Sequence, residues 1–291
     1  MMKKFLYRFF LFSLLPLLTL LVLEMWIGTK QEKLLSEKKL EQVFRNRADE
    51  YQWVSNIKHP KKIFLLGSSS IKYGLSCREL NRLAADSLAF INLAADARDP
   101  IETYFILKQL DRNRHQYLLL DLPFAKAVRY SKEYDARLFA KRYKALFHFP
   151  DPDHPASIAQ SKIPADFGSV ALTKKPVNFN DPVTKKYRLK DYGWSELQFT
   201  YLQKIVTLCE SNGIAFTAFY PPRRSDFILD DEKNGRDIRL SFEEQLMKAG
   251  FNRSIHPLQL LKDDLFADAY HLNKAGQETY SRYFFSFVQE N

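Results

Sequence analysis

The chain has 291 residues, of which 46% are hydrophobic and 27% are charged, and its formal net charge is +10. These fractions are typical of a globular protein and exclude a disordered or low-complexity chain. The positive charge comes without a recognition motif, so we expect no nucleic-acid partner and instead a surface suited to anionic membrane or envelope polymers. Two cysteines are too few for a disulfide framework or a zinc site. We expect Cys77 and Cys209 to be separate buried thiols, with a single disulfide as the alternative.

The N-terminal segment is predicted to anchor the protein in a bacterial inner membrane. No charged residue occurs from Phe9 to Leu23, and with its flanks from Phe5 to Ile27 the apolar stretch reaches the ~20 residues that span a bilayer. Basic residues precede it, which predicts a cytoplasmic N-terminus and an extracytoplasmic body. Small residues of a cleavage site are missing, which favours an uncleaved single-pass signal anchor over a cleaved signal peptide.

Helical periodicity continues beyond the apolar stretch, and we therefore divide the chain into three predicted parts. Leucines and aromatic residues recur at helical spacing among many charges, which indicates an amphipathic helix leading away from the membrane. We assign residues 1–28 to a cytoplasmic tip and transmembrane anchor, residues 29–58 to a helical stalk and residues 59–291 to the main domain.

Within the main domain, short apolar runs alternate with segments of helical periodicity. This alternation predicts an α/β fold, a three-layer sandwich in which helices cover both faces of a mainly parallel sheet. The expected strands are Ile63–Leu66, Leu88–Leu93, Tyr117–Leu122 and Ile214–Tyr220, and the expected helices are Cys77–Ala85, a stretch from Pro100, Ser195–Glu210, a segment ended by Gly250 and the end of the chain.

The alternation lapses between about residues 130 and 194. One part of this stretch, "YDARLFAKRYKALFHF", has helical periodicity, and another, "KKPVNFNDPVTKKYRLKDYGW", is rich in Pro, Lys and Tyr. We interpret it as an insertion that forms a lid or a substrate platform, with a packed surface excursion as the alternative. The carboxylates and histidine of "DPDHP" at Asp151–Pro155 lack the spacing of metal ligands, so we expect no metal and no cofactor.

Several segments that follow strands are predicted to meet at one edge of the sheet, because ligands of such folds collect beyond the carboxyl ends of the strands. They are Gly67–Ser70, Ala94–Arg98, the segment after Asp121 and Pro221–Arg224. Arg98, Arg223 and Arg224 at this edge have the chemistry to hold a carboxylate or phosphate by paired hydrogen bonds. Solvated loop charge is the alternative for these three arginines.

Serines and one distant histidine point to nucleophilic chemistry. A serine hydroxyl attacks poorly unless a base accepts its proton, and the base works best when a third group orients it. Of the six histidines, His271 has a carboxylate three residues earlier, Asp268, in the segment leading into the last helix. The stretch "FLLGSSSIKYGL" after the first strand supplies the serines. Either motif alone is weak, since serines at a helix start more often cap the helix than react.

Together the two motifs resemble those of the SGNH (GDSL-like) hydrolases. That family has a strand followed by Gly-Asp-Ser near its start and a D-x-x-H motif before its last helix, and here Gly67-Ser68-Ser69 and Asp268 to His271 occupy these places. The sequence "FADAYHLNKAGQETY" is similar to the corresponding motif of a membrane-anchored branch that includes D-alanine-transfer and polysaccharide O-acetylation accessory proteins. The α/β-hydrolases share the order Ser, Asp, His, but Ile71 replaces the second glycine of their nucleophile elbow.

The resemblance implies a flavodoxin-like sandwich and a site of defined roles. Ser69 would be the nucleophile, His271 the base and Asp268 its orienting group. Gly67, Asn92 and Ala94 would line the site, with the backbone N–H groups of Ser69 and Ala94 facing the oxyanion. The family's third-block asparagine is missing, because "LLLDLPF" offers only Asp121 there.

The function implied by the resemblance is that of a membrane-anchored serine esterase or O-acyltransferase acting on acyl groups of cell-envelope polysaccharide. A membrane-bound O-acyltransferase is the expected partner. The missing asparagine keeps open a catalytically inactive protein of the same fold that binds glycan or serves an envelope-modification complex. A membrane-tethered assembly factor that acts through its basic surface is a further alternative.

Overall fold

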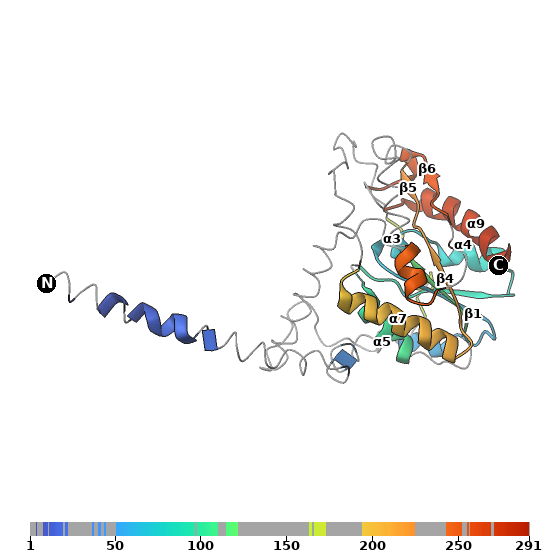
Figure 1. Cartoon of the computed structure of the whole chain (residues 1–291). Coiled ribbons are helices and arrows are strands. Elements are labelled where there is room, and N and C mark those ends of the chain that lie inside the picture. The colour runs from blue at the N-terminus through green and yellow to red at the C-terminus, as the bar shows by residue number, and fades with distance from the viewer. Residues whose placement is uncertain are drawn as a thin grey trace. The chain divides into compact units, whose positions relative to one another are not determined.

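A computed structural model gives the structure of the protein (Figure 1). It describes residues 51–96, 98–109, 115–121, 163–164, 166–172, 194–224, 243–251, 255, 257–268 and 271–290, with short pieces of residues 4–44. Contacts divide the chain into two compact units, Met1–Val43 with Arg137–Pro155, and Phe44–Ala136 with Ala156–Asn291. The sheet and the candidate site both belong to the second unit.

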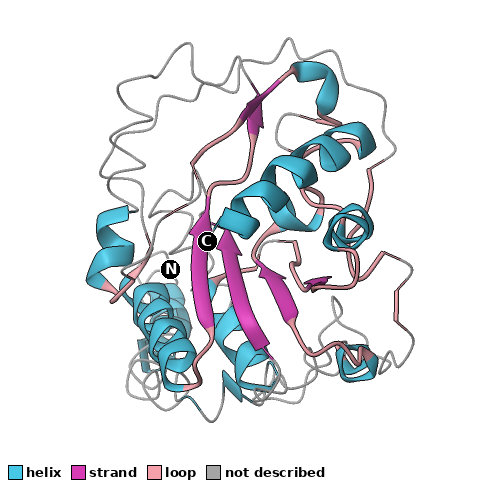
Figure 2. Cartoon of the chain, turned by 90° about the vertical axis from the view of Figure 1, so that its right-hand side faces the viewer, coloured by secondary structure: helices cyan, strands magenta, loops and turns pink. Residues whose placement is uncertain are grey.

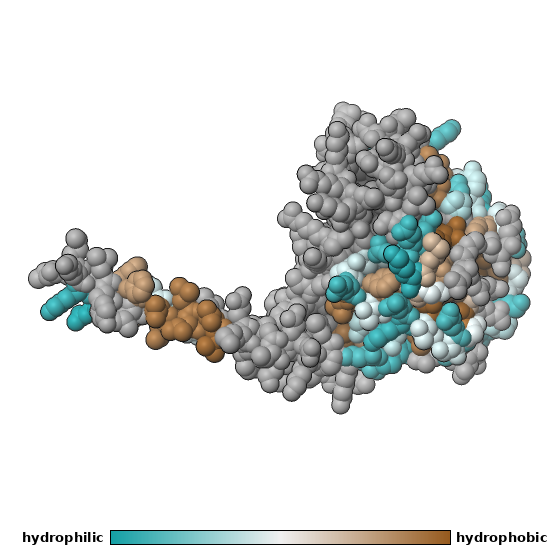
Figure 3. All heavy atoms as spheres, viewed as in Figure 1, coloured by the Kyte–Doolittle hydropathy of each residue, from teal (hydrophilic) through white to brown (hydrophobic). Residues whose placement is uncertain are grey.

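The N-terminal piece is described only in part. Its described large apolar side chains between Phe9 and Val22 are exposed, and they are coloured brown in Figure 3. Within the described part of the chain, no helix combines the length and the apolar character needed to cross a membrane. The transmembrane anchor therefore stays a prediction.

Four parallel strands form the main sheet, which confirms the α/β class. They are β1 (Lys62–Leu66), β2 (Ala89–Asn92), β3 (His115–Asp121) and β4 (Ala215–Phe219), in the spatial order β2-β1-β3-β4. The described side chains of β1 and β2 are buried throughout, as expected for strands covered on both faces. Because all four strands run the same way, their carboxyl ends share one edge of the sheet (Figure 2).

Two pairs of helices cover the faces of this sheet. One pair is α4 (Cys77–Ala84) with α9 (Lys274–Glu290), and the other is α5 (Pro100–Gln109) with α7 (Glu196–Ser211). Figure 1 shows the two pairs on opposite sides of the strands. Serine side chains cap two of these helices: Ser76 accepts a hydrogen bond from Glu79 N–H at 3.3 Å, and Ser195 accepts one from Gln198 N–H at 3.3 Å.

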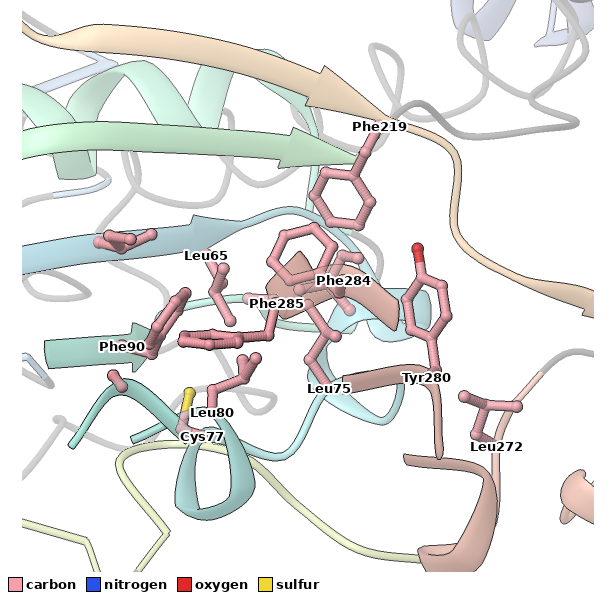
Figure 4. Packing of buried hydrophobic residues seen from close by; sticks show 14 of the residues in the cluster. Leu65, Leu75, Cys77, Leu80, Phe90, Phe219, Leu272, Tyr280, Phe284 and Phe285 are labelled. Carbon is pink, nitrogen blue, oxygen red and sulfur yellow. The ribbon is translucent and has the colours of Figure 1, made fainter. Parts of the chain in front are cut away.

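The core between the sheet and the α4–α9 pair is aromatic-rich (Figure 4). Phe90 of β2 packs on Phe285 of α9 with ring centroids 6.1 Å apart, and Phe219 of β4 packs on Phe284 at 5.0 Å. This packing fixes α9, and with it the segment that precedes α9, against the sheet whose strand β1 leads to the serines. Cys77 lies in the same core, Cys209 is also buried, and both are free thiols, as preferred from the sequence.

The segment predicted as a stalk does not end as an α-helix. Gln52–Asn56 is a 3-10 helix, η1, in which Trp53 and Val54 are buried. Ile57 is also buried. These apolar side chains pack into the second unit, which begins at Phe44 rather than at residue 59.

A two-stranded parallel ladder was not predicted. It joins β5 (Arg223–Arg224) to β6 (Leu260–Leu261), and the short 3-10 helix η5 (Asp263–Leu265) follows. Two residues per strand are too few for the apolar pattern of a strand to be visible in a sequence.

Candidate functional site

The first strand delivers three serines to the carboxyl edge of the sheet. After β1, Gly67 has a φ of 151°, a value that side-chain-bearing residues rarely adopt. Ser68 is extended and caps the short helix α3 (Ser69–Lys72), its hydroxyl accepting from Ser70 N–H at 3.4 Å. Ser68 therefore has a capping role, while Ser69 begins the helix with its hydroxyl directed elsewhere.

Ser69 lies in hydrogen-bond contact with His271, 202 residues further along the chain. Its Oγ is 3.0 Å from Nε2 of His271, and Nδ1 of that ring is 2.8 Å from Oδ2 of Asp268. Because a carboxylate accepts hydrogen bonds, Nδ1 carries the ring proton, and the lone pair of Nε2 is free to accept from Ser69 O–H. The two motifs that the sequence analysis paired therefore lie together in the structure. Hydrogen bonds join Ser69 to His271 and His271 to Asp268.

Asp268 holds His271 by two contacts. Its second oxygen, Oδ1, accepts the backbone N–H of His271 at 2.8 Å, so the carboxylate fixes both the main chain and the ring. The side chain of Asp268 is 43% exposed and that of His271 is 23% exposed, so the site opens to solvent. The contact at Nδ1 defines the tautomer of the ring, and the backbone contact fixes the main chain that carries it.

Hydrogen bonds within the segment around His271 close it into a turn before α9 begins. The backbone N–H of Ala267 donates to the carbonyl of His271 at 2.8 Å, and Asn273 N–H donates to the carbonyl of Leu265 at 3.0 Å. The side chain of Asn273 accepts from Gly276 N–H at 2.9 Å in the first turn of α9. The helix start therefore stabilises the turn that presents the imidazole.

Asn92, at the end of β2, is buried and fully engaged. Its Nδ2 donates to the carbonyl of Ile71 at 3.1 Å and to Ser169 Oγ at 3.3 Å, and its Oδ1 accepts the backbone N–H of Ala94 at 3.0 Å. The expected oxyanion role of Ala94 is at odds with this geometry, because its N–H already has an acceptor. Asn92 instead ties the end of β2 to α3.

Part of the predicted insertion binds directly to the site segments. We call residues Asp166–Leu172 the strap. Ser169 Oγ accepts Cys77 N–H at 3.0 Å, the carbonyl of Phe167 accepts Asn92 N–H at 2.9 Å, and Val170 N–H donates to the carbonyl of Lys72 at 3.3 Å. At its far end, Leu172 forms a parallel bridge with Asn273.

The strap therefore contacts the chain on all three sides of the site, after the serines, after β2 and before α9. The packed alternative holds for this part of the insertion, and the rest of residues 130–194 lies outside the described residues except for residues 163–164 and 194. "DPDHP" also lies outside them. Among the described residues no cluster of three or more His, Cys, Asp or Glu side chains is suited to hold a metal ion.

The three arginines do not form a solvent-facing anion site. Arg98 is 3% exposed, its Nε donates to Glu102 Oε1 at 3.2 Å, and its guanidinium also contacts the carbonyl of Leu93 and the hydroxyl of Tyr51. It is thus neither solvated nor directed at a ligand. Its partners tie the loop after β2 to α5 and to the segment before η1.

Arg223 and Arg224 are also buried, and they belong to β5. Arg224 donates to Oδ2 of Asp263, in η5, at 3.2 Å. Solvated loop charge is therefore wrong for both residues. Their burial in the small ladder gives them a structural setting, and the expectation that they bind a substrate anion finds no support in it.

Residues that the sequence motifs did not single out also border the triad. The ring of Tyr73, four residues after Ser69, packs edge-on against the ring of His271 with centroids 5.2 Å apart. The sequence could have indicated that Tyr73 lies near Ser69, because residues four apart in a helix lie on one face. It could not have indicated Ser169, because the hydrogen bond of Ser169 with Asn92 spans 77 residues.

Comparison with known proteins gives no further guide. No family model matches the chain, and no curated protein matches it significantly.

Proposed function

We propose that this protein is a serine esterase or O-acyltransferase of the SGNH type. The proposal rests on one observation: Ser69 Oγ, His271 Nε2, His271 Nδ1 and Asp268 Oδ2 form a continuous line of hydrogen bonds of 3.0 and 2.8 Å. Each group occupies the place that the motif resemblance assigns to nucleophile, base or orienting carboxylate. A parallel sheet that brings both motifs to one edge supports the flavodoxin-like assignment.

The geometry supports a two-step transfer. In the first step Ser69 Oγ attacks the carbonyl carbon of an ester, and His271 Nε2 accepts the serine proton. The tetrahedral adduct collapses as the imidazolium protonates the departing alcohol, leaving an acyl group on Ser69. In the second step His271 accepts a proton from water or a sugar hydroxyl, which attacks the acyl carbon and restores Ser69. Asp268 keeps the ring in position and stabilises its charged form.

One oxyanion donor is available without rearrangement. The backbone N–H of Ser69 lies at the first position of α3, where a helix leaves its N–H groups without partners, and no acceptor for it occurs among the described residues. The N–H of Ala94 becomes a second donor only if a substrate oxygen displaces Asn92 Oδ1. Loss of one such donor typically costs about a hundredfold in rate or more, so we expect a slow enzyme.

The substrate and setting of the proposal follow from the sequence. The predicted anchor and the positive net charge suit an extracytoplasmic protein at an anionic envelope. We therefore propose acylated cell-envelope polysaccharide as substrate and a membrane-bound O-acyltransferase as partner. These assignments rest on the family resemblance, since a fold of this kind does not determine its substrate.

A non-catalytic accessory protein of the same fold is the second candidate. The observation that favours it is the engagement of Ala94 N–H by Asn92, together with the lack of an asparagine in "LLLDLPF". Such a protein would retain the sheet, the strap and the buried arginines for stability, and it would bind glycan or a membrane partner without cleaving an ester.

Labelling with a fluorophosphonate separates the two candidates. We expect covalent modification at Ser69, abolished in Ser69→Ala and reduced roughly ten-thousandfold in Asp268→Asn, in which the ring is no longer oriented by a carboxylate. Ser68→Ala and Ser70→Ala serve as matched controls that keep the nucleophile. Folded wild-type protein that neither reacts with the probe nor hydrolyses p-nitrophenyl acetate would support the accessory role instead.

A further inference from the structure

A second cluster of side chains lies beside the proposed triad without belonging to it. Tyr73 follows α3 as its C-terminal capping residue, and its ring meets the ring of His271 at an interplanar angle of 77°. No other ring contact of His271 occurs among the residues that the structure describes. The imidazole is therefore held by Asp268 along one edge and bordered by one aromatic ring.

Tyr73 is itself held at both ends. Its backbone N–H donates to the carbonyl of Ser69 at 3.0 Å, which ties the residue to the nucleophile's own turn. At the other end its hydroxyl donates to Oδ2 of Asp96 at 3.3 Å. The same carboxylate oxygen accepts from Lys72 Nζ at 2.7 Å, and that ammonium lies 5.0 Å from the centre of the Tyr73 ring.

The three side chains thus form a closed unit in which each member contacts the other two. Asp96 follows β2, whereas Lys72 and Tyr73 follow β1, so the unit bridges the ends of two neighbouring strands. The side chain of Asp96 is 56% exposed and that of Lys72 is 24% exposed, so the ion pair faces solvent while the tyrosine ring faces His271. The ring is consequently the member of the unit that reaches the triad.

The hydrogen bond from Asp268 alone leaves the histidine ring with residual freedom. Rotation about the bond between Cβ and the ring is a broad, two-fold torsion, so a single contact at Nδ1 limits it only loosely. A ring packed against the imidazole narrows that freedom, because edge-to-face aromatic pairs have a preferred geometry. The direction of Nε2 toward Ser69 then depends on both contacts.

We propose that Tyr73 is a positioning residue for His271, its ring holding the imidazole so that Nε2 faces Ser69 Oγ, with the Asp96–Lys72 pair holding the tyrosine ring. This inference rests on the proposed function, because it assigns Tyr73 a role in the same proton transfer. The tyrosine hydroxyl acts at a distance from the reaction, through Asp96, and the ring acts through the histidine.

Replacement of the ring and of the hydroxyl separates the two roles. In the full-length chain, Tyr73→Leu removes the ring while keeping an apolar side chain, and we expect the rate of fluorophosphonate labelling at Ser69 to fall roughly tenfold. Tyr73→Phe restores the ring and should recover most of that loss. Tyr283→Leu, a change of an exposed tyrosine on α9, is the matched control and should label at the wild-type rate.

A spectroscopic measurement keeps the inference testable apart from catalysis. With 15N-labelled histidine, the proton on Nδ1 of His271 should give a resonance that broadens through exchange with water in Tyr73→Leu and not in Tyr73→Phe. If wild-type protein fails to label, the proposed function fails, and this resonance still decides whether Tyr73 positions the ring.

Three results would overturn the inference. The first is wild-type labelling and an unchanged resonance in Tyr73→Leu. The second is an equal loss of labelling in Tyr73→Leu and Tyr73→Phe, which would assign the effect to the hydroxyl. Should Tyr73→Leu fail to fold, Tyr73→Met removes the ring while keeping a flexible apolar side chain, and an unaltered labelling rate and resonance in that variant would count against the proposal equally.

Discussion

The side-chain amide of Asn92 donates a hydrogen bond to the carbonyl of Ile71, and 3.1 Å separates the two atoms. Ile71 lies two residues after Ser69, so this contact joins the end of β2 to the turn that carries the proposed nucleophile. The same side chain accepts from Ala94 N–H and donates to Ser169. Asn92 therefore connects three segments of the chain. This structural role goes beyond the site-lining role that the family resemblance implies.

We predict that Asn92→Ala destabilises the protein and slows labelling of Ser69. The change leaves the buried N–H of Ala94 without its acceptor and removes the amide contact to the Ile71 carbonyl, which keeps its backbone donors Gly74 and Leu75, so we expect a loss of about 2 kcal/mol in the free energy of unfolding. Urea unfolding measures the loss of stability, and fluorophosphonate labelling of the folded protein measures the rate at Ser69.

Asn81→Ala is the matched control for this prediction. Asn81 also bonds to β2, through Phe90 N–H at 2.6 Å and the Phe90 carbonyl at 3.2 Å, but it lies on α4 away from the serines. We expect Asn81→Ala to lower the free energy of unfolding without changing the rate of labelling at Ser69. Equal labelling losses in the two variants would show that Asn92 acts only through overall stability.

The strap provides a second prediction, at Gly168. This residue has a φ of 91°, and a Cβ placed on it would come within 2.0 Å of the carbonyl oxygen of Asn92. Backbone atoms cannot give way by so much without moving the end of β2. Gly168→Ala should therefore lower the free energy of unfolding by about 3 kcal/mol or more, beyond the ~1 kcal/mol of an unfavourable φ alone.

Gly213→Ala isolates the contribution of the dihedral angle. Gly213 has a φ of 63°, and a Cβ placed on it would have no atom within 4 Å, so only the backbone effect applies there. Chemical denaturation of both variants gives the comparison. Similar losses at the two positions would mean that the strap yields easily and does not restrain Asn92.

Much of this architecture is readable from the sequence, and the exceptions have physical causes. The strands are apolar on both faces and end at glycine, proline or polar residues, so their positions follow from local pattern, as β1 and β4 show. The meeting of Ser69 with His271 was expected from the resemblance to the SGNH motifs, of which one follows the first strand and the other precedes the last helix. Local signals identified the two motifs, and the resemblance paired them.

The environments of Arg98 and Ala94 could not be read in the same way. Arg98 has one partner four residues later, Glu102, which a helix makes plausible, but its contact with Tyr51 spans 47 residues. Sequence alone gives no measure of the burial that makes such a guanidinium structural. The N–H of Ala94 is taken by a side chain two residues earlier, a local turn that depends on the backbone conformation after β2.

The last prediction concerns the ion cluster that links α4 to α9. Glu79 Oε1 accepts from Arg82 at 2.8 Å, within α4, and from Arg282 of α9 at 2.9 Å. The hydrogen bond from Arg82, followed by that from Arg282, outweighs the opposing effect of burial and lowers the pKa of Glu79 to about 2, from an ordinary value of 4.5. The carboxylate is therefore a stronger acid in the folded protein than in the unfolded chain.

A lowered pKa means that the unfolded chain binds a proton first as the pH falls. The stabilisation from Glu79 is then present above about pH 4.5 and is lost as the pH falls toward about 2. We expect Glu79→Gln to reduce the free energy of unfolding at pH 7 by about 1 kcal/mol, because the side chains of Arg82 and Arg282 are 63% and 60% exposed and solvent screens their charges. Urea unfolding from pH 7 to about pH 2.5 should show the difference from wild type narrowing across this window, and Glu244→Gln, at an exposed position, serves as the matched control. A difference that stays constant with pH would assign the effect of Glu79→Gln to packing between α4 and α9.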